Sequence, residues 1–135
     1  MTGTVKNPVA DVFERWVTAI ESTVGKGNYS MEKSVTIASA KKKYARLFLM
    51  GNPTQSTSLE GHECATVLSF QAESYASGTK DLLNAYEIDN ISHEAMISMG
   101  FRRTYGPEEV ENSEKSFKRI ISRYSRVYTG QLLET

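Results

Sequence analysis

His62, Glu63 and Cys64 are the residues whose types most resemble a set of metal ligands. They are consecutive, and a strand sends successive side chains to opposite faces, so Glu63 would point away from the other two. A zinc site needs three or four converging ligands, and the only other histidine in the chain is His93. We therefore expect a surface histidine and a small buried cysteine, with no metal.

The spacing of Asp89 and His93 is that of an oriented general base on one helical face. The sequence offers no evident nucleophile for such a base. We therefore expect an imidazole held by an i,i+4 contact beside Tyr86 and Ile97. The segment 25–28, Gly-Lys-Gly-Asn, lacks the spacing and the terminal Lys-Ser/Thr pair of a phosphate loop, and it predicts a helix stop and a turn. Neither pattern predicts catalysis or a cofactor.

Basic and aromatic residues alternate near the C-terminus, as on a surface that binds nucleic acid, because phosphates need cations and bases need flat rings for stacking. Four glutamates within 108–114 precede them, and sixteen basic residues balance sixteen acidic ones over the whole chain. A nucleic-acid surface normally has a net basic footprint, so subunit contacts explain this pattern better. A nucleic-acid module stays as an alternative. The residues concerned are Lys115, Lys118, Arg119, Arg123, Arg126, Tyr124 and Tyr128, with Arg102 and Arg103 before them.

The length of 135 residues predicts a single domain, with residues 1–6 and 131–135 as flexible or interface tails. One cysteine excludes an internal disulfide framework and fits a reducing compartment. The N-terminal residues contain no apolar run of the kind that a signal peptide needs. No segment approaches the ~20 consecutive apolar residues of a membrane span, so we expect no membrane partner.

Hydrophobic periodicity predicts an α+β fold, in which an antiparallel sheet is flanked by two helices in the order α-β-β-β-α-β-β. The first helix starts at Pro8, where a missing N–H is harmless, and runs to Val24. The second lies between Thr79 and Met99. The expected strands are 31–40, 44–50, 63–76, 101–105 and 116–129. The segments 51–59 and 106–114 are expected to be loops, the second because Gly-Pro breaks the strand before it.

The second helix has two apolar stripes, whereas a lone domain buries only one. The surplus stripe predicts a contact with another copy of the chain, and the alternative is a helix packed between two layers of its own domain. One stripe contains Leu82, Tyr86, His93, Met96 and Ile97. The other contains Ile88, Ile91, Ala95 and Met99, and we assign it to the subunit interface.

The order and character of the segments over residues 7–130 resemble the tail terminator, or tail-completion, proteins of long-tailed bacteriophages, which are also called minor capsid or minor tail proteins. The segments that carry this resemblance follow the first helix and read YARLFLMGNPTQSTSLEGHECATVLSFQAESYA, TKDLLNAYEIDNISHEAMISMGF and FRRTYGPEEVENSEKSFKRIISRYSRVYTG. The resemblance lies in element order and size, with no catalytic signature.

The resemblance implies a virion protein with an α+β fold, no enzymatic activity and no cofactor. It implies a homohexameric ring that caps the head-proximal end of the tail tube, stops tube polymerisation and docks on the head–tail connector. The implied partners are further copies of the chain, the major tail tube protein and the connector protein, with DNA only passing through the lumen. Assembly would take place in the host cytoplasm. Another head–tail connector protein or minor tail component remains the alternative.

Separation of charge between the acidic segment and the basic strand suits a head-to-tail contact, in which different surfaces of two copies meet. Polar loops on a rigid scaffold suit contact with other virion proteins. The expected subunit-interface residues are Ile88, Ile91, Met99, Arg102, Arg119, Arg123, Glu109 and Glu111. The expected tube or connector contacts are Asn52, Pro53, Thr54 and Gln55.

Overall fold

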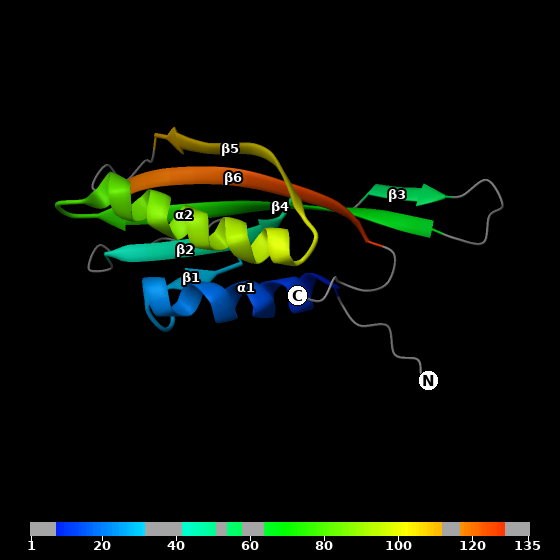
Figure 1. The fold of residues 1–135 in the computed structure, drawn as a ribbon, viewed down its shortest axis with the longest axis horizontal. Helices are drawn as coiled ribbons and strands as arrows, with labels where there is room; N and C mark the ends of the chain where they lie inside the picture. The colour runs from blue at the N-terminus through cyan, green and yellow to red at the C-terminus, as the bar shows by residue number, and fades with distance from the viewer. Residues whose placement is uncertain (1–7, 32–41, 51–53, 58–63, 112–116, 129–135) are drawn as a thin grey trace.

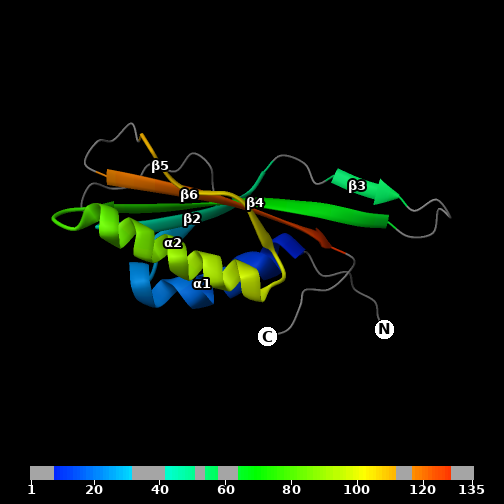
Figure 2. The same ribbon diagram turned by 45° about the horizontal axis from the view of Figure 1, so that its top comes forward.

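The computed structural model describes residues 8–31, 42–50, 54–57, 64–111 and 117–128. Two helices lie on the same face of a twisted sheet (Figures 1 and 2), which confirms the α+β class. The helices are α1 (Pro8–Val24) and α2 (Asp81–Ser98). The strands are β1 (Tyr29–Ser30), β2 (Lys43–Leu49), β3 (Thr54–Thr57), β4 (Cys64–Ser77), β5 (Arg102–Val110) and β6 (Phe117–Tyr128).

Helix α1 has the bounds that its sequence predicts. Its apolar residues recur at intervals of three and four, so one stripe faces the sheet, and Val12, Trp16 and Ile20 on it are fully buried. Gly25 follows the last turn with φ of +100°, a conformation that residues with a side chain rarely adopt. The predicted helix stop is thereby confirmed.

The sheet has the strand order β1-β2-β4-β6-β5. All neighbouring pairs on this path are antiparallel except β1 and β2, which run parallel with Tyr29 opposite Ala45. The sheet is therefore mixed, where the sequence predicts a purely antiparallel one. Residues 31–42 separate the two parallel strands, and that length is enough for the crossover that a parallel pair needs. Of the predicted strand 31–40, only Met31 is among the described residues, and it follows β1.

Strand β4 is long enough to pair with two strands along one edge. Residues 70–76 of β4 pair with β2, and residues 64–67 pair with β3. On the other edge, the pairing of β4 with β6 starts only at Thr66, opposite Tyr128, so β3 and the start of β4 form a two-stranded arm that extends beyond both helices (Figure 1). The prediction of a loop is therefore wrong for Thr54–Thr57. Thr54 and Thr57 are β-branched and favour a strand, but the turn residues before them in the sequence hide that signal.

Strand β5 continues through the Gly106–Pro107 peptide bond, which is cis, so the predicted strand break there is wrong. A proline is tolerated because β5 is an edge strand, and register irregularities flank this position. Gly106 has φ of +88°, and a Cβ there would lie 2.3 Å from the carbonyl oxygen of Ile121. The backbone of β5 therefore approaches β6 more closely than a side chain would allow. As a result Glu108 and Glu109 lie in a strand and not in a loop.

The main core lies between the two helices and the sheet face that they cover. The indole Nε1–H of Trp16 donates a hydrogen bond of 2.8 Å to Ser92 Oγ, which ties α1 to α2 inside this core. The buried residues of the core are Val12, Trp16, Ile20, Val24, Ala45, Leu47, Leu68, Phe70, Ala72, Ile88, Ala95, Met96, Met99, Phe101 and Tyr124.

Candidate assembly surfaces

One face of α2 is buried in the chain's own core. Ile88 and Met99 are almost fully buried, and Ile91 is half-buried and packs against the same cluster. The expectation that this stripe meets another copy is therefore wrong at Ile88 and Met99. Periodicity locates both stripes, but it does not say which one faces the sheet. The buried side is the one that carries Ala85, Asp89 and Ser92 as well, and these short or polar residues weaken its hydrophobic signal.

The other face of α2 remains open in the isolated chain. We call this surface the α2 stripe and define it by four exposed apolar residues, Leu82, Leu83, Tyr86 and Ile97. Leu83 is 67% exposed, and Ile97 is 44% exposed. Large apolar residues exposed along a single helix are the usual mark of a contact site. Met96, which the sequence places on the same stripe as Leu82 and Ile97, is buried in the core, so only part of that stripe is exposed. Contact of the exposed part with another copy stays a prediction.

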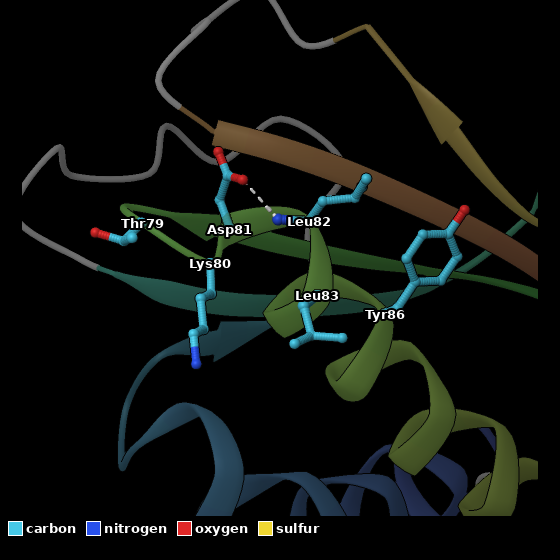
Figure 3. A pocket seen from close by; sticks show the side chains of 6 residues that line it. All are labelled: Thr79, Lys80, Asp81, Leu82, Leu83 and Tyr86. Carbon is cyan, nitrogen blue, oxygen red and sulfur yellow. Dashed lines mark hydrogen bonds between the residues drawn. The ribbon is translucent and has the colours of Figure 1, made fainter.

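The α2 stripe begins at a shallow hollow next to the first turn of the helix (Figure 3). Thr79, Lys80 and Asp81 border it on the polar side, and Leu82, Leu83 and Tyr86 line it on the apolar side. The Asp81 carboxylate accepts a 2.6 Å hydrogen bond from the Leu82 backbone N–H, which satisfies a donor at the helix start. The hollow is open and carries one apolar side, so it suits a side chain of another protein surface better than a small ligand.

The Asp89 and His93 pair lies at the border between α2 and the sheet. Asp89 accepts hydrogen bonds from Ser122 Oγ (2.7 Å) and Arg103 Nη2 (3.3 Å), and His93 Nδ1 is 3.3 Å from the hydroxyl of Tyr124. Each of the two therefore has partners on β5 or β6, where the sequence predicts a contact within the helix. These contacts fasten α2 to the two last strands.

Burial sets the electrostatics of this cluster. Loss of solvation raises the pKa of Asp89 above its ordinary value, although Ser122 and Arg103 oppose the rise. Loss of solvation and the nearby Arg103 cation lower the pKa of His93. Burial also raises the pKa of Tyr124. Asp89, His93 and Tyr124 therefore form one cluster of contacts between α2 and the last two strands.

The helix-free face of the sheet carries a buried carboxylate, Glu73 of β4. It accepts hydrogen bonds from Arg119 Nη2 (2.9 Å), Gln71 Nε2 (2.5 Å) and the hydroxyl of Tyr75, and Arg46 Nε lies 3.6 Å away. Burial alone would raise the pKa of Glu73, but these hydrogen bonds and cations outweigh it and lower the pKa. This network joins β2, β4 and β6 on the face that neither helix covers (Figure 2).

Two predicted interface arginines belong to this face. Arg119 binds Glu73, and Arg123 donates its Nε–H to Gln71 Oε1 at 2.9 Å while its guanidinium lies over the ring of Tyr105. Both arginines are half-buried, so part of each remains at the surface. Contacts within the chain hold them in place, and contact with another copy stays a prediction for both.

The predicted acidic partners lie elsewhere on the surface. Glu109 is exposed in β5 and forms a surface ion pair with Lys118 at 3.8 Å, while Glu111 is exposed just after β5. Arg102 is exposed at the start of β5. The structure therefore does not bring Arg119 and Arg123 together with Glu109 in one chain. Pairing of these groups between copies remains a prediction.

The cations that suggest a nucleic-acid surface are divided between the two faces of the sheet. Arg126 points to the helix side and donates to the backbone oxygen of Met99 at 2.6 Å, whereas Arg119 and Arg123 lie on the other side. Lys115 lies outside the described residues. This arrangement offers no continuous basic strip on β6, and it weakens the nucleic-acid alternative.

Two of the four expected tube or connector contacts fall on the arm. Thr54 and Gln55 belong to β3, and Asn52 and Pro53 lie outside the described residues, as do His62 and Glu63. Across the described ranges, no group of three or more His, Cys, Asp and Glu residues could hold a metal ion. Neither helix there is long and apolar enough to cross a lipid bilayer.

Comparison with known proteins gives a fold but no family. No protein-family model and no curated protein sequence matches the chain. Among solved structures, the fold is similar to that of a chain in the structure described as "Virion of native gene transfer agent (GTA) particle", with a TM-score of 0.60 and 13% sequence identity. The likeness covers 90% of this chain and 98% of that chain. At this identity the likeness establishes a shared fold over nearly the full length of both chains.

Proposed function

We propose that this chain is a structural protein of a phage-like virion. The observation that carries the proposal is the full-length fold likeness to a chain of a gene transfer agent virion. The sequence resemblance to tail terminator proteins leads to the same class of particle from a separate direction. The exposed α2 stripe also supports it, because a protein that acts within an assembly needs surfaces to bind its neighbours.

Within the virion, we propose the role of tail terminator. Copies of the chain form a ring, expected to be a hexamer, at the head-proximal end of the tail tube. One side of the ring matches the tube, and the other side presents a different surface to the head–tail connector. Each tube subunit binds the end of the tube and then presents the same kind of surface to the next subunit, so the tube has no intrinsic end. Growth stops when a ring with a different outer surface is added. The chain then acts by shape alone, without catalysis or a cofactor.

The arm formed by β3 and the start of β4 is our candidate for contact with the tube or connector. It extends beyond the helices, so it can reach a neighbouring protein without disturbing the core (Figure 1). Among the described strands, β3 pairs with β4 alone, so its other edge is a place where another protein could add a strand.

The test is a particle-producing strain that lacks this chain, examined by electron microscopy. The terminator role predicts tails of uncontrolled length that are not joined to heads, and complementation with the intact chain should restore both. Tails of normal length that fail to join would favour a connector role over a terminator. Normal tails joined to full heads would refute both roles.

A further inference from the structure

Exposed apolar groups occur on both faces of the sheet and not only on the side of the helices. The α2 stripe lies on the helix side. On the helix-free face, Val127 of β6 is 53% exposed, and Tyr105 of β5 is 37% exposed beside Arg123. Opposite faces of one chain therefore each present apolar side chains to solvent. Such a pair of surfaces suits a contact in which the two copies use different faces.

Carboxylates flank the α2 stripe, and arginines prevail on the helix-free face, where the exposed Glu108 accepts a hydrogen bond from the Tyr105 hydroxyl at 2.7 Å. Glu87 and Glu94 are exposed on α2 next to the stripe. On the helix-free face, Arg119 and Arg123 are fixed by contacts with Glu73 and Gln71, so their positions are set before any partner arrives. Two α2 stripes packed against each other would bring four glutamates together, which is unfavourable. Packing α2 against the helix-free face would bring glutamates to arginines.

The size of the stripe sets a further condition. From Leu82 to Ile97 the helix extends about 22 Å at 1.5 Å per residue. With a width of about 10 Å, the stripe supplies roughly a quarter of the ~800 Å² that each partner contributes to a standard interface. The charged residues beside it must then also lie within the contact. The interface therefore needs complementary charges on the two surfaces as well as apolar contact.

We propose that the α2 stripe of one copy packs on the helix-free sheet face of the next copy, over Tyr105, Arg123 and Val127, with Glu87 and Glu94 facing the arginines. This inference rests on the proposed function, because a protein that forms a ring needs a contact between neighbouring copies. The inference names the two surfaces that make this contact. Repetition of one heterologous contact closes a ring when the rotation between copies is a simple fraction of a turn.

Two variants with one blocked surface each give a direct test. The helix variant carries Leu83→Glu and Tyr86→Glu, and the sheet variant carries Arg123→Glu and Val127→Glu. Ala10→Glu on the exposed side of α1 is the matched control, because it also adds a carboxylate to an exposed helical position. Light scattering gives the mass, and circular dichroism verifies the fold.

We expect the parent and the control to assemble, and each blocked variant to need at least about 100-fold more protein for the same degree of assembly. Mixing the two variants is the decisive step. The helix variant retains an intact sheet face, and the sheet variant retains an intact stripe, so the mixture should give a 1:1 dimer of about 30 kDa and nothing larger. A contact between two α2 stripes instead predicts that the sheet variant dimerises on its own, as the parent does, and that the helix variant stays monomeric in the mixture.

Absence of the mixed dimer would overturn the proposal, as would a sheet variant that assembles like the parent. If the sheet variant does not fold, Val127→Glu alone replaces it, because that exposed side chain leaves the new charge in solvent in the single chain. A parent that stays monomeric at high concentration would refute this contact, and the tail-length experiment would still decide the proposed function. Head-to-tail assembly of a chain whose loss leaves tails normal would support the contact and refute the terminator role.

Discussion

The assignment of the two faces of α2 leads to a quantitative prediction for Ile88→Ala. Ile88 is fully buried in the main core, and the change removes three buried carbon groups at about 0.8 kcal/mol each. The cavity left behind adds to this loss, so the free energy of unfolding should fall by about 3 kcal/mol. Leu83→Ala is the control, since a side chain that is 67% exposed should cost less than about 0.5 kcal/mol.

Urea denaturation followed by fluorescence measures both values, because the only tryptophan, Trp16, lies buried in the same core. With a slope of about 2 kcal/mol per molar urea, the midpoint for Ile88→Ala should fall by about 1.5 M. Both variants must be compared with the parent at one protein concentration, since assembly also stabilises the folded chain. A larger loss for Leu83→Ala would show that the stripe and not Ile88 faces the core, and equal losses would refute the difference in burial between the two faces.

Three further predictions concern the polar clusters and the edge strand. Glu73→Gln should lower the free energy of unfolding by about 3 kcal/mol at neutral pH, because it leaves the Arg119 cation without its buried partner. The pKa of Glu73 is lowered in the folded chain, so its contribution to stability is present above the ordinary glutamate pKa and is lost as the pH falls through the folded value. Denaturation at low pH should therefore depend less on pH in the variant than in the parent. Asp89→Asn should change the pH dependence of stability in the opposite direction. The pKa of Asp89 is raised in the folded chain, so its contribution to stability is present at low pH and declines as the pH rises from about 3.9 through the folded value. Urea titrations across that pH range should show this decline in the parent and not in the variant. Gly106→Ala should cost more than about 1 kcal/mol in thermal unfolding, because its Cβ would meet the oxygen of Ile121 at 2.3 Å, and a neutral result would contradict the close approach of β5 and β6.

Periodicity and capping signals locate most of the regular structure. The bounds of α1 match the prediction because its apolar stripe, its N-terminal proline and the glycines after it all agree. The strand at Thr54–Thr57 escapes prediction because it is polar and owes its conformation to pairing with residues 64–67 of β4. The passage of β5 through Gly106–Pro107 likewise depends on its place at the sheet edge and on the pairing with β6.

For the candidate assembly surfaces, the sequence by itself determined that α2 has two apolar stripes, because periodicity is a local property of the helix. Only the tertiary structure decided that Ile88 and Met99 face the sheet and that Leu83 faces solvent, since this choice depends on which side docks against β4 and β6. The sequence likewise determined the abundance of charge near the C-terminus. The pairing of Arg119 with Glu73, 46 residues apart, comes from the strand register and could not be seen in local spacing.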